Sequence, residues 1–309
     1  SGTRSALGNF GGSLKDVEFT ELASHVARAC IEKSGASPSA IDHIVFATTC
    51  PTDKDSLFAA RVVGMKSGLP EEAAALDVSR ACASGLQAII SAGQQIETGQ
   101  SQLALAAGAE MFSRVPFAVT TSRWGNPRGN QQLEDVLEWC YRCPFSLEYM
   151  GDTAENLTEK YQYERAPMDD YAVSSQTRAL AAIESGFLTK QIVAVDVPEG
   201  RSTRVFDTDE SPREGITLER LAKLRPAFQE GGKVTAGNSS GVTDGAGAML
   251  VGTRESMVAN GVMPEARVVD WTVVGVPPRL MGHGPVPAIE KLLARTGLTI
   301  PEIDYFEVN

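Results

Sequence analysis

The spacing of apolar positions, three or four residues apart, predicts a helix over residues 20–33, near the start of the chain. Its apolar side chains recur at helical spacing and share one face: Leu22, Val26, Ala29 and Cys30. A turn follows, and the continuous apolar run at 44–48 predicts a buried strand. The first fifty residues therefore indicate an α/β arrangement.

A similar order of elements recurs at the C-terminal end. Apolar spacing predicts a helix through 288–293, and an apolar strand follows at 305–308. In both copies the glycine that ends the helix lies six residues before an Ile–Asp pair, Gly35 before Ile41 and Gly297 before Ile303. So short a phrase can agree by chance, but a duplicated α/β unit is the better explanation.

The two copies differ in length. The first continues for about 70 residues beyond Asp42, whereas the second ends five residues after Asp304. A strand as apolar as 305–308 needs the rest of its layer around it. We therefore expect further chain beyond Asn309, and a first strand before Gly2.

Residues 113–242 differ in character from the segments on either side. They contain a polar, aromatic loop at 123–127, helical stretches at 152–186 and the beginning of a glycine-rich stretch at 231–247. The predicted fold class is α/β. Residues 1–112 and 243–263 form a first core half, 113–242 are inserted in it, and 264–309 begin a second half.

Composition and charge exclude several classes of protein. The chain has 309 residues, 42% hydrophobic and 22% charged, as in an ordinary α/β globular protein. Its net charge of −11 argues against binding to nucleic acid or to an anionic membrane. No apolar run approaches the ~18 residues of a transmembrane helix, and the start lacks the apolar core of a signal peptide. Five cysteines without a small-domain framework predict reduced thiols in an intracellular compartment.

Cys140 and Cys143 form a C-x-x-C motif with three interpretations. A redox pair requires a strand–turn–helix context, and a zinc site requires two further ligands nearby. The sequence shows neither context, and Pro144 follows at once. We therefore interpret both residues as structural or incidental thiols.

Cys82 is the strongest candidate for chemistry. A short apolar stretch ends at 77–79, and from Leu86 the spacing predicts a helix, so Cys82 lies in the turn between them or in the first helical turn. Unpaired N–H groups at a helix N-terminus favour a thiolate. An ordinary thiol is only about 3% ionised at pH 7, and the helix supplies ~1 kcal/mol, so a nucleophile here would also need a histidine partner. The alternative is a small buried hydrophobic residue, but the small residues around Cys82 leave room for a substrate.

Residues 78–87, Val-Ser-Arg-Ala-Cys-Ala-Ser-Gly-Leu-Gln, resemble the nucleophile segment of thiolases, with Ser79 where the family typically has Asn. Four further segments resemble thiolase motifs in the same order: Met-Gly-Asp-Thr-Ala-Glu-Asn at 150–156, Leu-Glu-Arg-Leu-Ala-Lys-Leu-Arg-Pro-Ala-Phe at 218–228, Val-Thr-Ala-Gly-Asn at 234–238 and Met-Gly-His-Gly-Pro at 281–285. The end, Glu307-Val308-Asn309, resembles the start of another. Within the family, the sequence motifs are most similar to those of the mitochondrial-type 3-ketoacyl-CoA thiolases.

This resemblance implies a thiolase-like duplicated α-β-α-β-α layered core with an inserted loop domain. It implies Cys82 as nucleophile and Asn309 as the holder of an oxyanion-hole water. The residues implied to contact CoA or substrate are Met150, Arg213, Arg220, Phe228, Ala236, Ser240, Gly241 and Met281. An activating His and a second Cys are implied beyond Asn309. Tyr149 and His283 replace residues common in the family, and His283 is not assigned as the base.

The implied reaction is thiolytic cleavage of 3-oxoacyl-CoA to acetyl-CoA and a shortened acyl-CoA, or the reverse Claisen condensation, through a Cys82 thioester. CoA and acyl-CoA are substrates, and neither a metal nor a covalently bound cofactor is implied. The family resemblance also implies a homodimer or homotetramer, in a bacterial cytoplasm or a mitochondrial matrix.

Three alternatives remain open. A thiolase-fold protein could bind acyl-CoA without turnover, as an assembly or carrier subunit. A decarboxylating ketosynthase relative would have two His residues, or His and Asn, instead of a second Cys. Finally, residues 237–241 satisfy G-x-S-x-G, the nucleophile elbow of α/β-hydrolases, which requires a strand directly before it and a downstream His. The only later His is His283.

Overall fold

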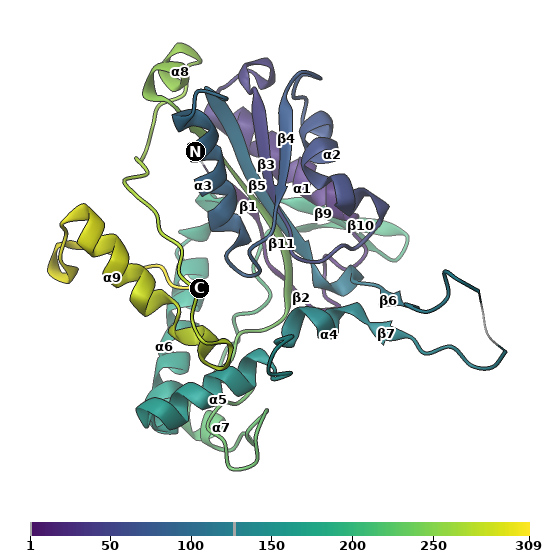
Figure 1. The fold of residues 1–309 in the computed structure, drawn as a ribbon, viewed down its shortest axis with the longest axis vertical. Helices are drawn as coiled ribbons and strands as arrows, with labels where there is room; N and C mark the ends of the chain where they lie inside the picture. The colour runs from purple at the N-terminus through teal and green to yellow at the C-terminus, as the bar shows by residue number, and fades with distance from the viewer. Residues whose placement is uncertain (1, 126–127) are drawn as a thin grey trace. The chain divides into compact units, whose positions relative to one another are not determined.

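The computed structural model describes residues 2–125 and 128–309 (Figure 1). Ser1, with which the predicted first core half begins, and Asn126 and Pro127 in the predicted inserted segment lie outside the described residues. The chain divides into two compact units. The first unit comprises Ser1–Cys140, Ile183–Ser211 and Val242–Arg267, and the second comprises Tyr141–Ala182, Pro212–Gly241 and Val268–Asn309.

The first unit is built on a seven-stranded mixed sheet in the order β4–β3–β5–β11–β1–β8, with β2 paired to β11. Its strands are β1 (Gly2–Ser5), β2 (Gly8–Asn9), β3 (His43–Ala47), β4 (Ala74–Val78), β5 (Leu103–Met111), β8 (Ile192–Val193) and β11 (Thr243–Gly252). β3 runs parallel to both β4 and β5, whereas β11 runs antiparallel to β5 and β1. The strand predicted at 44–48 is thereby confirmed, and the apolar stretch that ends at 77–79 forms the strand beside it, at one end of the sheet.

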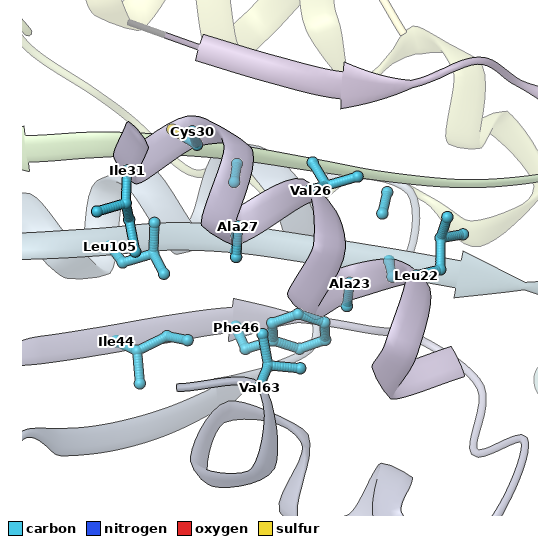
Figure 2. Close-up of a cluster of buried hydrophobic side chains, with 14 of the residues drawn as sticks. Leu22, Ala23, Val26, Ala27, Cys30, Ile31, Ile44, Phe46, Val63 and Leu105 are labelled. Atoms are coloured by element: carbon cyan, nitrogen blue, oxygen red, sulfur yellow. The ribbon is translucent and has the colours of Figure 1, made fainter. Parts of the chain in front are cut away.

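Helices cover both faces of this sheet: α1 (Phe19–Ser34), α2 (Ala59–Lys66) and α3 (Ser84–Glu97). Successive side chains of a strand point to opposite faces. Accordingly, Ile44 and Phe46 of β3 pack with α1 and with Val63 of α2, as Figure 2 shows. Val45 and Ala47 pack instead against α3. The first unit is therefore a helix–sheet–helix sandwich.

The predicted repeat is confirmed up to the second glycine and the short helix that follows it. α1 ends at Gly35 with φ 79°, and α9 (Pro285–Thr296) ends at Gly297 with φ 72°. Glycine is favoured at both positions because a Cβ is strained in this left-handed conformation. Each glycine is followed by a 3₁₀ helix, Pro38–Ala40 and Ile300–Glu302. The strand predicted at 305–308 is wrong: these residues form no strand, since none of the described residues pairs with them.

The remaining elements are short. The first unit also contains the strand pairs β6 (Phe117–Ala118) with β7 (Glu134–Asp135) and β9 (Val195–Glu199) with β10 (Ser202–Phe206), the helix α8 (Arg254–Ala259), and α4 (Val136–Tyr141), which ends at the boundary. The second unit is helical, with α5 (Met150–Tyr161), most of α6 (Arg165–Glu184), α7 (Leu218–Ala222), a 3₁₀ helix at Pro278–His283, and α9. Among the described residues, no helix combines the length and the apolarity that a bilayer crossing requires.

The prediction that the cysteines are all reduced thiols is wrong for two of them. Cys50, which follows β3, is disulfide-bonded to Cys140 in α4. Cys30, Cys82 and Cys143 form no disulfide bond with any described residue. The bonded pair is 90 residues apart in the sequence, so spacing could not reveal it. The C-x-x-C motif is thus neither an internal redox pair nor a zinc site, and cysteine usage no longer argues for an intracellular location.

The packing of the core between α1 and the sheet allows a prediction of how much free energy of unfolding is lost when one aromatic side chain is removed. Phe46 is fully buried and packs edge-on against Phe19, with ring centroids 5.8 Å apart. We expect Phe46→Ala to lower the free energy of unfolding by ~3–5 kcal/mol, because it leaves a cavity. Phe58→Ala is the matched control: its ring is 64% exposed, so we expect a change within about 0.5 kcal/mol. Urea unfolding measures both, and equal effects would contradict this assignment of the core.

Candidate active site

Cys82 lies in the turn that joins β4 to α3, as the sequence predicted. Its side chain is a free thiol and is exposed. The alternative of a small buried hydrophobic residue is therefore wrong. Beside it, a Cβ built at Gly85 would meet no atom within 4 Å, so this side of the turn is open.

The turn has an unusual backbone at Ala81, where φ is 46°. A residue with a Cβ is strained in this left-handed region by ~1–2 kcal/mol. Hydrogen bonds to the Ala81 carbonyl oxygen offset that strain: it accepts from the Ser84 hydroxyl at 2.6 Å, from the Ser84 N–H at 3.0 Å and from the Thr49 hydroxyl at 3.3 Å. The Ser84 hydroxyl oxygen in turn accepts from the Arg80 N–H at 2.7 Å. Ser84 thus closes the turn on both sides of Ala81.

The helix that follows begins without a side-chain cap. Its N-cap residue is Ala83, which has no polar side chain, and α3 continues for 14 residues. The first N–H groups of a helix carry a partial positive charge when no side chain accepts from them. This end of α3 therefore favours an oxyanion that forms beside Cys82.

In the second unit, three of the sequence-predicted segments meet on α5. A Cβ at Gly151 would overlap the ring of Phe228, so that ring packs directly against the first turn of α5. A Cβ at Gly282 would lie 2.8 Å from Leu157 Cδ1, so the segment of Met281 packs against the same helix. The structure thereby brings together the segments of Met150, Phe228 and Met281.

Two buried acids fix the loop that contains Ala236, Ser240 and Gly241. Glu155 of α5 accepts hydrogen bonds from the backbone N–H groups of Lys233 at 2.7 Å and Val234 at 2.6 Å. Asp169 of α6 accepts from the Asn238 side chain at 2.9 Å, and Asn238 accepts from the Thr235 N–H at 2.8 Å. Neither acid was predicted from the sequence as a site residue. Their signal would have been a carboxylate on the inner face of a predicted helix, which is rare without a partner.

The other predicted residues lie in the second unit with fewer contacts. Arg220 donates to the Gly215 carbonyl at 2.6 Å, and the Arg213 N–H donates to the Gln176 side chain at 2.8 Å. Asn309 is exposed and outside regular structure. Cys82 belongs to the first unit, whereas all of the other predicted site residues belong to the second.

The hydrolase alternative fails on local structure. Residues 237–241 follow an isolated bridge at Thr235 and not a strand, so they do not form a strand–turn–helix elbow. His283 stacks on Tyr161, with its Nδ1 3.1 Å from the Tyr161 hydroxyl. Among the described residues, no three His, Cys, Asp or Glu side chains gather as metal ligands.

Comparisons with known proteins match the whole chain. The model of the thiolase N-terminal domain matches residues 1–255, and that of the thiolase C-terminal domain matches 262–309. The chain is 42% identical to beta-ketothiolase BktB of Cupriavidus necator, over 100% of the chain and 79% of that protein. It is 38% identical to the mitochondrial 3-ketoacyl-CoA thiolase of Bos taurus, over 99% of the chain and 77% of that protein.

Solved structures agree with these matches. Human mitochondrial 3-ketoacyl-CoA thiolase in complex with CoA superposes with a TM-score of 0.93 at 35% identity, covering 98% of this chain and 76% of that one. Acetyl-CoA acetyltransferase of Bacillus anthracis gives a TM-score of 0.93 at 39% identity, covering 98% of this chain and 77% of that one. The expected fold is thereby confirmed.

An ion pair in the second unit predicts a lowered pKa for the carboxyl group of Glu148. Glu148, just before α5, accepts hydrogen bonds from Arg279 at 3.0 Å and from Asn156 at 3.1 Å, and these bonds lower its pKa from 4.5 to about 2. We expect Arg279→Met to raise the Glu148 pKa towards 4.5, as measured by NMR titration of the carboxyl carbon. Because the folded pKa is lowered, the pair stabilises the fold above pH 4.5 and loses that contribution as the pH falls towards 2. Arg213→Met is the control and should leave the Glu148 titration unchanged; an unchanged titration in Arg279→Met would contradict the pairing.

Proposed function

Because this chain belongs to the thiolase family, we propose that Cys82 carries acyl groups between CoA thiols. The protein is an enzyme of the thiolase type. Its reaction is thiolytic cleavage of 3-oxoacyl-CoA, or the reverse condensation of two acyl-CoA molecules. The observation that supports the role of Cys82 is its free, exposed sulfur in a turn that opens an uncapped helix.

The reaction takes place in two transfers. The Cys82 thiolate attacks the 3-keto carbon, the bond between C2 and C3 breaks, and its electron pair leaves with the acetyl-CoA fragment, which takes up a proton. The shortened acyl group stays on Cys82 as a thioester. The thiol of a second CoA loses its proton, attacks this thioester, and restores the Cys82 thiolate. One thioester replaces another, so the transfer is readily reversible.

Negative charge develops on oxygen during these two transfers. The attacked carbonyl becomes an oxyanion, and oriented N–H donors stabilise such a charge in the transition state. The uncapped N-terminus of α3 supports a role for backbone N–H groups at Cys82. We assign Asn309 to the enolate oxygen, through a bound water, on the family resemblance alone.

The acyl-CoA is proposed to contact the second unit. Met150, Phe228 and Met281 come from segments that meet on α5, and the fixed loop after Val234 carries Ala236, Ser240 and Gly241. Ser240 is suited to bond a pantetheine amide, while Arg213 and Arg220 are suited to the nucleotide phosphates. That a human relative was solved with CoA supports this assignment.

We propose the assembly and the location of the protein on the basis of the family and of one edge of the sheet. β4 is a terminal strand of the sheet, and its residues 74–77 are exposed. An unpaired strand edge readily pairs with another chain, which supports a homodimer or homotetramer. The bacterial and mitochondrial relatives support a bacterial cytoplasm or a mitochondrial matrix.

Replacement of the nucleophile tests the proposed function. We expect Cys82→Ser to keep the fold but to lose both thiolysis of acetoacetyl-CoA and exchange of labelled CoA into acetyl-CoA, by about 10³-fold or more, because the hydroxyl is a far weaker nucleophile. Cys143→Ser, which removes another free thiol, should keep both activities. Exchange that survives in Cys82→Ser would rule out this nucleophile. Binding of acetyl-CoA by an unsubstituted protein that catalyses neither reaction would favour the non-catalytic subunit.

Removal of one cationic side chain tests the CoA site. We expect Arg213→Gln to raise KM for CoA by about tenfold with little change in kcat, because a phosphate contact is worth ~1.5 kcal/mol in ground and transition state alike. Steady-state kinetics with N-acetylcysteamine, which lacks the nucleotide, should show no difference from the unsubstituted protein. Arg201→Gln, on the turn between β9 and β10, is the control for charge. An equal loss with both thiols would contradict the assignment to phosphate.

A further inference from the structure

One acid in the sheet of the first unit has no part in the proposed reaction. Glu110 lies in β5 and interrupts an otherwise apolar strand. Burial raises its pKa, while hydrogen bonds from Cys50, Thr49 and Thr48 act in the opposite direction. A carboxylate in such a position is stable only when donors surround it.

Those donors come from the chain that leaves β3. Glu110 accepts from the Thr49 N–H at 2.8 Å and from the Cys50 N–H at 3.1 Å. The strand register explains why the Glu110 side chain can accept from these N–H groups. Ala47, the last residue of β3, is opposite Gly108 of β5. A Cβ at Gly108 would lie 2.9 Å from both the Cβ and the carbonyl oxygen of Ala47, so the two strands approach closely there. Glu110 is two residues further on, where residues 49 and 50 have left the sheet and need another acceptor.

The segment that Glu110 holds touches the turn of Cys82. The Thr49 hydroxyl donates to the Ala81 carbonyl at 3.3 Å. Ala81 is the left-handed residue directly before Cys82, so the orientation of its carbonyl determines where the next residue points. A chain of contacts therefore runs from Glu110, through the backbone and side chain of Thr49, to the peptide that precedes the thiol.

We propose that Thr49 and Glu110 are positioning residues for Cys82. Glu110 fixes the backbone of Thr49, and the Thr49 hydroxyl keeps Ala81 in the conformation that directs the thiol towards substrate. This inference rests on the proposed role of Cys82 as nucleophile. Neither residue touches the reacting atoms; both act through the Ala81 peptide.

Because the hydrogen bond from the Thr49 hydroxyl to Ala81 is exposed, its effect on the acylation rate can be distinguished from its effect on the stability of the fold. The bond is exposed, so water can replace the hydroxyl as a donor and the fold loses little without it. A displaced nucleophile costs rate even when the fold is intact, because acyl transfer needs the sulfur close to the carbonyl and aligned with it. Thr49 variants should therefore change the acylation rate while leaving the thermal midpoint nearly constant.

The test compares Thr49→Val with Thr49→Ser in the full-length protein. The measurements are the single-turnover rate of Cys82 acetylation by acetyl-CoA, its half-saturation concentration, and the thermal midpoint. We expect Thr49→Val, which has no hydroxyl, to slow acetylation about tenfold at an unchanged half-saturation concentration. Thr49→Ser keeps the hydroxyl and should stay within about twofold of the natural protein. We expect Glu110→Gln to slow the same step and, combined with Thr49→Val, to slow it by less than the product of the two effects.

Thr98→Val is the matched control. The Thr98 hydroxyl also donates to a backbone carbonyl, that of Gln94 at 2.9 Å, but at the opposite end of α3. It should leave the acetylation rate unchanged. Acetylation of Thr49→Val at the natural rate, or equal slowing by Thr49→Ser, would overturn the positioning role while leaving Cys82 as the nucleophile. Acetylation that persists in Cys82→Ser would instead overturn the proposed function, and this inference with it.

Discussion

The geometry of the Cys82 turn depends on the left-handed backbone of Ala81, the residue before Cys82. Its φ of 46° is held by donors to a single carbonyl, two from Ser84 and one from Thr49. Since β4 ends at Val78 and α3 begins at Ser84, the chain must reverse between them within a few residues. A left-handed residue allows that reversal, and it leaves the thiol outside the packed layers. The strain is small, but the surrounding bonds over-determine it, as is common at functional sites.

Carboxylates inside the protein serve a common purpose in both units. Glu110 accepts from N–H groups that leave the sheet, and Glu155 accepts from N–H groups of the loop at 233–234. Each acid lies on a regular element and fixes an irregular segment of its own unit. A charged acceptor makes stronger hydrogen bonds than a neutral one. Rigid strands and helices can therefore position loops, which by themselves have few buried contacts.

Much of the fold could be predicted because local patterns agree with tertiary packing. The strand at 44–48 and the helix ends at Gly35 and Gly297 follow from apolar spacing and from the left-handed conformation that glycine permits. The strand expected at 305–308 failed because strand formation depends on partners that apolar content does not supply. The Cys50–Cys140 bond was missed for a related reason, since 90 intervening residues separate its halves. The position of Cys82 followed from sequence, whereas the hydrogen bonds of Thr49 and Ser84 to the Ala81 carbonyl depend on the tertiary structure.

The turn that joins β4 to α3 is proposed to present a sulfur that accepts acyl groups from CoA. The most direct test is mass-spectrometric peptide mapping of the protein after rapid acid quenching during turnover with acetyl-CoA. We predict one acetyl group for each chain, on the peptide that contains Cys82, with Cys30 and Cys143 unmodified. Acetylation at another residue, or a Cys82 peptide that stays unmodified while the enzyme turns over, would contradict the account.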